Sequence, residues 1–210
     1  MIKVIGFDLD NTLYDQRKFE FESFQIISKM VSINFNIDEI QYFNNLKHLH
    51  LQGENQYLFD KAFIQCNGCL KSNWENFVTK EILPSYRNFS PKKLKLFSGM
   101  REKIIKLKNS NLKLVLITNG NKKVQNNKIE ALKIRKYFDL ILISDEFSPK
   151  RRKPDIFMFM QALEFFSVSG IEMAYVGDDL IRDKACDKLG IKFIHYKNQI
   201  NLKPEKFFEL

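Results

Sequence analysis

The sequence has few of the residues that cross-link, kink or break a chain: 3 cysteines, 5 prolines and 8 glycines among 210 residues. The cysteines, Cys66, Cys69 and Cys186, form no obvious disulfide framework, which favours a reducing compartment. No window reaches the roughly 18 consecutive apolar residues of a membrane helix. The N-terminus runs into an apolar stretch without a charged-then-apolar leader. We therefore expect a cytoplasmic protein that does not contact membranes.

Internal repeats and low-complexity linkers are also missing, and the hydrophobic content of 44% is sufficient for a real core. The net charge of +9 suits an anionic partner such as nucleic acid, a membrane surface or a phosphorylated metabolite. No nucleic-acid-binding motif is present, and the lysines are spaced as on solvated helix faces. A small phosphorylated metabolite is the partner that we expect.

The pair Cys66 and Cys69 allows two interpretations. Together with His48 and His50 it could complete a Cys₂His₂ zinc site, but the H-x-H spacing is unusual for structural zinc. The alternative, which we favour, is a turn at Asn67-Gly68 with two buried thiols.

Five apolar, β-rich runs lie at 3–10, 112–120, 138–144, 172–179 and 191–196. Segments of helical character separate the last four, at 121–138, 154–168 and 180–190. Strands that alternate with helices indicate an α/β fold, a Rossmann-like parallel sheet with helices on both faces.

The segment between the first two β-rich runs has a different residue pattern and few strand signals. It carries two apolar stripes at helix-compatible spacing, Phe21, Phe24, Ile27 and Val31, followed by Ile37, Ile40, Phe43 and Leu46. We therefore predict an inserted α-helical cap subdomain over 15–96, with the main domain formed by 1–14 and 97–210.

Polar side chains gather where the predicted strands end. Ligands of an open parallel sheet bind beyond the carboxyl ends of its strands. The residues at or after these ends are Asp8 and Asp10, then Thr118, Asn119 and Gly120, then Lys153, and finally Gly177, Asp178 and Asp179. One hydroxyl, one ammonium and several carboxylates are thus expected to converge on one crevice.

Asp8 and Asp10 stand two residues apart on an extended chain, so their side chains point to the same face and repel one another unless a cation or a shared proton lies between them. Oxygen ligands without histidine or cysteine favour Mg²⁺ over zinc, and Mg²⁺ readily binds substrate phosphate oxygens. Thr118 and Lys153 could hold a phosphoryl group. The crevice therefore indicates a phosphate site.

These residues resemble the haloacid dehalogenase superfamily of aspartate-nucleophile phosphohydrolases. Its D-x-D-x-T motif is matched by DLDNT at 8–12, its strand ending in Ser or Thr by Thr118, its lysine by Lys153 in KPD, and its G-D-x-x-x-x-D motif by Asp178 and Asp183. All four occur in the family's order. Ile156 and Ser98 stand where proline is usual, and neither change affects a chemical group.

The resemblance implies a role for each matching residue. Asp8 would be the nucleophile that forms an aspartyl-phosphate, and Asp10 the general acid and then base. The Asp8 carboxylate, the Asp10 backbone carbonyl and Asp178 would hold Mg²⁺. Thr118, Asn119 and Lys153 would bind the phosphoryl group. Asp179 and Asp183 could each tune the metal or orient the lysine, and we favour Asp183 for the lysine.

The resemblance also separates the activities that the family contains. Dehalogenating members lack a carboxylate at the position of Asp10, so its presence favours a Mg²⁺-dependent phosphatase of the dehalogenase-like branch. A helical insert at this place resembles the caps of that branch, which would close over the crevice and select the substrate. Tyr14, Arg17 and Lys18 could face the substrate or pack. A phosphomutase and a non-catalytic binding protein of the same fold are the alternatives, and the oligomeric state stays open.

Overall fold

The computed structural model describes residues 1–196, so the last part of the predicted main domain, 197–210, lies outside the described residues. The chain divides into two compact units. One comprises Met1–Gln16 and the chain from Lys92 onwards, and the other comprises Arg17–Pro91. The helical insert predicted over 15–96 differs from the second unit by a few residues at each end.

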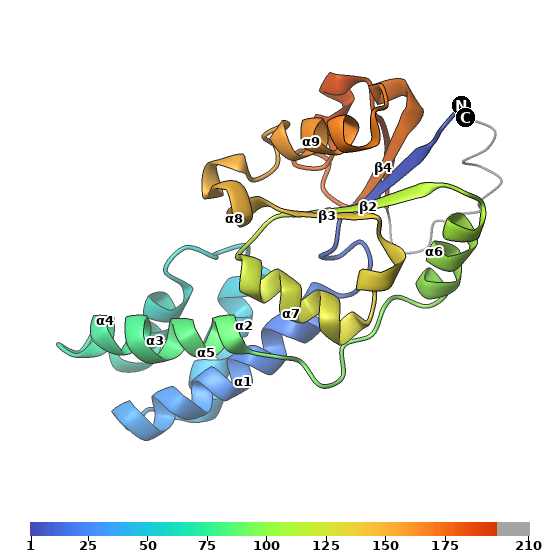
Figure 1. The fold of residues 1–210 in the computed structure, drawn as a ribbon. Helices are drawn as coiled ribbons and strands as arrows, with labels where there is room; N and C mark the ends of the chain where they lie inside the picture. Colours follow the sequence, from blue (N-terminus) through green and yellow to red (C-terminus); the bar gives the residue numbers. More distant parts are fainter. Residues whose placement is uncertain (197–210) are drawn as a thin grey trace. The chain divides into compact units, whose positions relative to one another are not determined.

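The first unit is built on a parallel sheet (Figure 1). Its five strands among the described residues are β1 (Val4–Phe7), β2 (Lys113–Thr118), β3 (Leu140–Ile143), β4 (Met173–Gly177) and β5 (Lys192–His195). They lie in the order β3-β2-β1-β4-β5, and every neighbouring pair is parallel. All five strands predicted from the sequence are confirmed, and β1 occupies the centre.

Helices cover both faces of this sheet. The α-helices of the unit are α6 (Met100–Asn109), α7 (Lys122–Leu132), α8 (Ser144–Phe147) and α9 (Phe157–Phe166). Short 3₁₀ turns are η2 (Arg135–Tyr137), η3 (Pro149–Arg151), η4 (Gly170–Glu172) and η5 (Lys184–Leu189). In Figure 1, α9 lies on the opposite side of the sheet from α6 and α7, which confirms the α/β, Rossmann-like architecture.

The segment 180–190, expected to be helical, is the exception. It forms only the 3₁₀ turn η5 after a stretch of turns. Asp179 Oδ1 accepts hydrogen bonds from the backbone N–H groups of Ile181 and Arg182, as an N-cap residue does, but the chain that follows continues as a 3₁₀ turn and not as an α-helix.

The sheet is buried on both faces because its strands alternate apolar side chains between two helical layers. One core contains Val115 and Ile117 of β2 together with Met158 and Phe159 of α9. Leu114 and Leu116, which alternate with Val115 and Ile117 along β2, are also fully buried. Strands that are apolar at consecutive positions are typical of parallel sheets. Across residues 1–196, every helix is too short or too polar to cross a membrane.

The second unit is helical. Its elements are α1 (Gln16–Phe35), which starts one residue before the unit, α2 (Glu39–Leu51), α3 (Leu58–Asn67), α4 (Trp74–Phe77), the π-helix η1 (Val78–Ile82) and α5 (Leu83–Asn88). Aromatic rings dominate its core: the rings of Phe63 and Trp74 have centroids 3.9 Å apart, and Phe35 contacts both. The unit therefore has a core of its own.

The stripe predicted on α1 is confirmed for Phe24, Ile27 and Val31, which are buried. The stripe on α2 is wrong at Ile40, which is 70% exposed. The buried face of α2 instead carries Tyr42, Leu46 and Leu49, a spacing that the sequence pattern also allowed.

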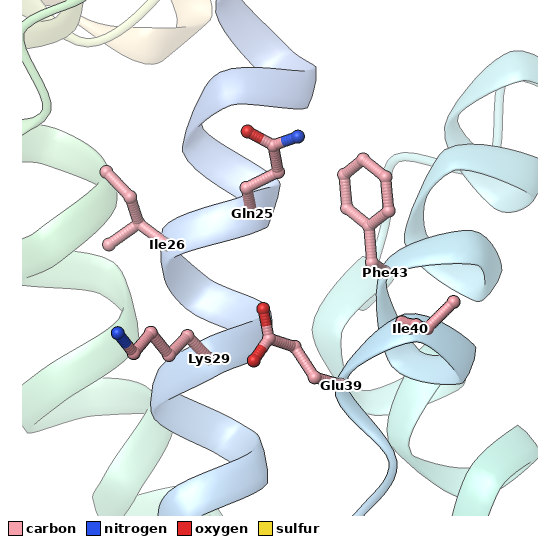
Figure 2. Close-up of a pocket in the computed structure, with 6 residues that line it drawn as sticks. All are labelled: Gln25, Ile26, Lys29, Glu39, Ile40 and Phe43. Carbon is pink, nitrogen blue, oxygen red and sulfur yellow. The ribbon is translucent and has the colours of Figure 1, made fainter.

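Exposed Ile40 lines a pocket of about 440 Å³ between α1 and α2 (Figure 2). Its walls are Gln25, Ile26, Lys29, Glu39, Ile40 and Phe43. The pocket contains one ammonium and one carboxylate, with apolar side chains on both helices.

The turn predicted at Asn67-Gly68 is present, since α3 ends at Asn67 and Gly68 has a φ of 76°. Cys66 is half-buried and its Sγ accepts a hydrogen bond from Asn45 Nδ2 at 3.2 Å. Cys69 is exposed, as are its neighbours Gly68 and Leu70, so the expectation of two buried thiols is wrong for this residue.

Candidate active site

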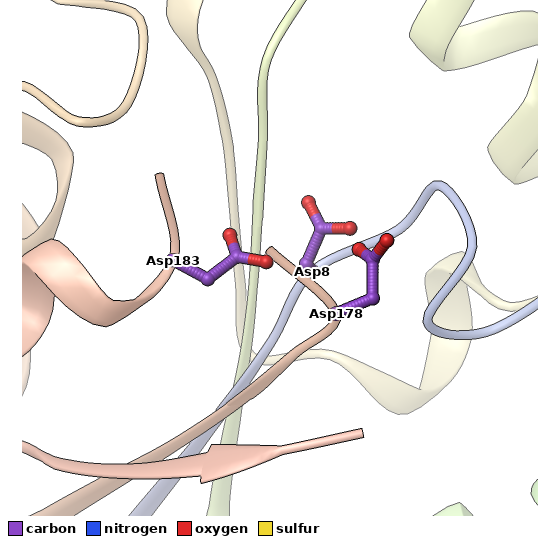
Figure 3. Close-up of side chains that lie close together, drawn as sticks. All are labelled: Asp8, Asp178 and Asp183. Carbon is purple, nitrogen blue, oxygen red and sulfur yellow. The ribbon is translucent and has the colours of Figure 1, made fainter. Parts of the chain in front are cut away.

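Three carboxylates meet at the carboxyl edge of the sheet (Figure 3). Asp8 follows β1, Asp178 follows β4, and Asp183 precedes η5, with one oxygen of each within 4.8 Å of the others. Asp8 is 6% exposed and Asp183 1%. Two neighbouring strands place the first two carboxylates, since the Asp8 N–H donates to the Val176 carbonyl at 2.9 Å.

A buried ammonium lies beside two of these carboxylates. Lys153 Nζ is 2.7 Å from Asp8 Oδ1 and 2.5 Å from Asp183 Oδ1. It also donates to the Tyr175 hydroxyl at 2.8 Å and to the Ile117 carbonyl at 3.1 Å. The lysine therefore bridges the ends of three strands, and its side chain is fully satisfied without a ligand.

Asn119 fixes the backbone of this lysine. Its Oδ1 accepts from the Lys153 N–H at 2.7 Å, and its Nδ2 donates to the Lys153 carbonyl at 3.0 Å. Both polar ends of the Asn119 side chain are thus engaged. The observed bonds give Asn119 a part in positioning Lys153, whereas its predicted contact with substrate stays a prediction.

Burial dominates the electrostatics of the site. It raises the pKa of Asp8 to about 8, with further raising by the charges of Asp183 and Asp10, although Lys153 opposes it. Burial and the charge of Asp183 likewise raise the pKa of Asp178 to about 6. Burial alone would lower the pKa of Lys153, but Asp8 and Asp183 outweigh it and raise this pKa. The site thus has more negative charge than one lysine neutralises.

The donor chemistry fits a hard divalent cation. Asp183 is already engaged at both oxygens, because Oδ1 bonds Lys153 and Oδ2 accepts from the Asp179 N–H at 3.1 Å. Asp8 and Asp178 are therefore the better placed pair for a metal. Thr12 supports Asp178 through a hydroxyl that donates to its Oδ1 at 3.3 Å. Oxygen donors of this kind fit Mg²⁺.

Asp10 has a separate set of partners. Its carboxylate forms an ion pair with Lys128 at 2.9 Å and accepts hydrogen bonds from Gln125 Nε2 at 3.0 Å and the Tyr14 hydroxyl at 2.5 Å. Its side chain does not belong to the carboxylate group around Lys153. The predicted role of Asp10 as a metal ligand concerned its backbone carbonyl and stays a prediction.

Thr118 ends β2 and is buried, and its hydroxyl accepts a hydrogen bond from Gln125 Nε2 at 2.6 Å. Gly120 next to it has a φ of 132°, which suits glycine, and its N–H donates to the Ser144 hydroxyl at 3.0 Å. The turn after β2 is thus fixed by bonds to two other segments.

The structure adds residues that the sequence reasoning did not assign, namely Gln125, Lys128 and Tyr175. The sequence left open whether Tyr14 faces the substrate or packs. It is fully buried, and its hydroxyl donates to Asp10. A signal for Lys128 was available: it stands among the buried positions of α7 with Val124, Ile129 and Leu132, where a charge needs a partner. Tyr175 carried no such signal because an aromatic residue is normal in a strand.

Gly177 leaves room for the Asp183 carboxylate. A methyl group at this position would lie 2.3 Å from Asp183 Oδ2, which is closer than real contacts allow. We expect Gly177→Ala to displace Asp183 from Lys153 and to lower the rate of any reaction at this site by at least about tenfold. Steady-state kinetics with a Tm measurement check this. Gly53→Ala is the control for a general loss of stability, because Gly53 belongs to the helical unit and has open space around it, but its φ of +80° strains any side chain placed there. Native rates in Gly177→Ala would contradict the prediction.

Comparison with known proteins places this site in a family. The model of the family described as haloacid dehalogenase-like hydrolase matches residues 5–196. A protein of Pyrococcus abyssi named glyceraldehyde 3-phosphate phosphatase is 31% identical, with 94% of this chain and 82% of the relative aligned. A human protein named N-acylneuraminate-9-phosphatase is 22% identical, with 87% and 76% aligned.

Solved structures agree at the level of the fold. A hydrolase of the haloacid dehalogenase superfamily from Geobacter sulfurreducens has a TM-score of 0.69 at 18% identity and covers 95% of this chain and 89% of its own. A protein titled putative beta-phosphoglucomutase from Thermotoga maritima has a TM-score of 0.67 at 20% identity, with 97% and 91% covered. The family match spans both the sheet and the carboxylate site, and it confirms the resemblance seen in the motifs: this chain belongs to the haloacid dehalogenase-like hydrolases.

Proposed function

We propose that this protein is a Mg²⁺-dependent phosphomonoester hydrolase that acts on a small phosphorylated metabolite in the cytoplasm. The observation that carries this proposal is the arrangement of Asp8: a buried carboxylate at a strand end, 2.7 Å from the Lys153 ammonium, with Asp178 beside it. A second carboxylate, Asp10, is held apart from the first by its own partners. In this proposal Asp8 is the nucleophile, Asp10 is the proton donor, and Lys153 is the cation that stabilises the phosphoryl group.

In the first step, an oxygen of Asp8 attacks the phosphorus atom of the substrate. A new bond forms between the carboxylate oxygen and phosphorus while the bond from phosphorus to the ester oxygen breaks. Asp10 in its protonated form gives its proton to the departing oxygen, so the product leaves as an alcohol. Lys153 and Thr118 stabilise the charge on the transferring phosphoryl oxygens.

In the second step, Asp10 is a carboxylate and accepts a proton from water. The water oxygen bonds to phosphorus, the bond to Asp8 breaks, and inorganic phosphate leaves. Asp8 returns as a carboxylate and Asp10 returns to its protonated form. The enzyme is unchanged after one alcohol and one phosphate have been formed from one ester and one water.

The metal would be held by the carboxylates of Asp8 and Asp178 and by the backbone carbonyl of Asp10. When bound, Mg²⁺ supplies positive charge that keeps Asp8 ionised and draws the phosphate oxygens toward it. Asp183 would keep Lys153 aimed at the same place, in agreement with its bond to the lysine.

The relatives suggest the substrate class. Several are named glyceraldehyde 3-phosphate phosphatase, with identities up to 31%. We propose a short phosphorylated sugar or sugar acid as substrate, and we propose that the helical unit is the cap that selects it. The net charge of +9 favours anionic compounds of this kind.

The test is phosphate release from a panel that contains glyceraldehyde 3-phosphate, other sugar phosphates, sugar acid phosphates and nucleoside monophosphates, with Mg²⁺ or with excess chelator. We expect turnover with Mg²⁺ that falls to background with chelator and returns when Mg²⁺ is restored. Turnover that is undiminished in chelator would contradict the metal dependence. No release from any compound, together with phosphoryl exchange between sugar positions, would favour a mutase instead.

A further inference from the structure

The partners of Asp10 form a buried polar cluster that the reaction above does not use directly. Lys128 Nζ lies 2.9 Å and 3.1 Å from the two oxygens of the Asp10 carboxylate, so one ammonium contacts both. Gln125 Nε2 donates to Asp10 Oδ2 at 3.0 Å. The carboxylate is thus fixed in rotation as well as in place, and when Asp10 carries the proton that it donates, its other oxygen can still accept from Lys128.

Both residues come from one face of α7. Lys128 is only 2% exposed and Gln125 only 1%, although they occupy positions at which the helix otherwise buries apolar side chains. Removing an ammonium from water costs several kcal/mol unless a counter-charge compensates for it. The close ion pair with Asp10 provides such a counter-charge, so α7 places a cation beside this carboxylate.

Gln125 also joins two parts of the site. The same Nε2 that donates to Asp10 donates to the Thr118 hydroxyl at 2.6 Å. Thr118 ends β2 and Asp10 follows β1, so the amide fixes the distance between the proton-transferring group and a phosphate-binding hydroxyl.

Two lysine ammonium groups therefore pair with two different carboxylates. Lys153, from the loop after β3, pairs with Asp8, whereas Lys128, from α7, pairs with Asp10. This division predicts different consequences for the two lysines: removal of Lys153 affects the nucleophile, and removal of Lys128 affects proton transfer to the ester oxygen.

We propose that Lys128 and Gln125 are positioning residues that aim the Asp10 carboxyl group at the departing ester oxygen. The inference rests on the proposed phosphatase function and deepens it. It assigns Lys128 to one half-reaction, protonation of the leaving group, whereas Gln125 also holds the Thr118 hydroxyl, so its loss is expected to affect both substrates.

The dependence of kcat/KM on the leaving group distinguishes a positioning role from a merely structural role, because loss of stability alone would not depend on the leaving group. An alkyl phosphate such as a sugar phosphate releases a strongly basic oxygen and needs a proton in the transition state. p-Nitrophenyl phosphate releases a weakly basic phenolate that leaves without one. Because kcat/KM reports the steps up to the first phosphoryl transfer, the ratio of kcat/KM for the two substrates isolates the acid function from the later attack of water.

The experiment compares the native chain with Lys128→Met and Gln125→Met, with Asp10→Asn as the reference for complete loss of the acid. Lys123→Met is the matched control, because it makes the same change at an exposed position of the same helix. Lys128→Arg tests rescue of the charge. We expect Lys128→Met to lose at least about tenfold more kcat/KM on the sugar phosphate than on p-nitrophenyl phosphate, with Lys123→Met unchanged and Lys128→Arg in between.

Equal losses of Lys128→Met on both substrates, or no loss on either, would overturn the proposal. Should Lys128→Met fail to fold, as its Tm would reveal, Lys128→Gln carries the same comparison, since it removes the charge and keeps a side chain that can donate to Asp10. A failure of the proposed function is distinguishable, because the native chain would then release no phosphate from either substrate.

Discussion

Replacing Asp8 by asparagine is expected to lower kcat by at least about 10⁴-fold on every phosphomonoester that the native chain hydrolyses. The amide has almost the shape of the carboxylate, but it is a poor nucleophile and cannot form the acyl phosphate. Acid quench of a single turnover measures this directly: labelled phosphate should remain on the native chain briefly and never on Asp8→Asn.

The variant should still fold. Asp8 is buried and its pKa is raised to about 8, so loss of its negative charge removes a repulsive group as well as a partner of Lys153. Asp187→Asn makes the same chemical change at an exposed position of η5 and should have native kinetics. Native turnover in Asp8→Asn, or a trapped phosphoenzyme in that variant, would contradict Asp8 as nucleophile.

The second large effect is expected for Lys153→Met. Its ammonium contacts Asp8 and Asp183 and is 4% exposed, so the substitution leaves two buried carboxylates without this cation. Breaking a buried ion pair by removing one partner costs about 3–5 kcal/mol in the free energy of unfolding. We also expect kcat to fall by about 10²–10³-fold, because a cation that stabilises the transferring phosphoryl oxygens is lost.

Urea unfolding and phosphate release measure the two effects on the same preparations. Lys150→Met serves as the control, because Lys150 is exposed in the same loop. Mg²⁺ should raise the stability of Lys153→Met more than that of the native chain, since a bound cation partly replaces the missing charge. Native stability in Lys153→Met without metal would contradict the importance of this ion pair.

Most of the fold was accessible from the sequence because apolar runs and turn residues are local signals. The five strands are confirmed, whereas the helix expected at 180–190 is a 3₁₀ turn and Ile40 is exposed. The two errors have different origins. An apolar residue at helical spacing does not reveal whether a neighbouring element covers it, and a helical composition does not distinguish a 3₁₀ turn from an α-helix.

The main candidate site residues could be predicted because they stand at or after strand ends, where topology brings such residues together. The supporting residues were not assigned, because Lys128 and Gln125 project from the middle of α7 and lie more than a hundred positions from Asp10 in the chain. Only the packing of the helix against the sheet reveals such pairs. The dual bonding of Asn119 to Lys153 depends in the same way on two loops whose approach no sequence pattern encodes.

The order of the sheet also has a consequence for how the chain folds. β1 leads into Asp8, the proposed nucleophile, and is the central strand, yet its residue Val4 pairs with Lys113 on one side and Met173 on the other, both far along the chain. Such non-local pairings require closure of long loops and slow the search for the native state. A chain that ends before β4 has neither the second neighbour of β1 nor Asp178, which follows β4. We therefore expect chains of that length to be inactive.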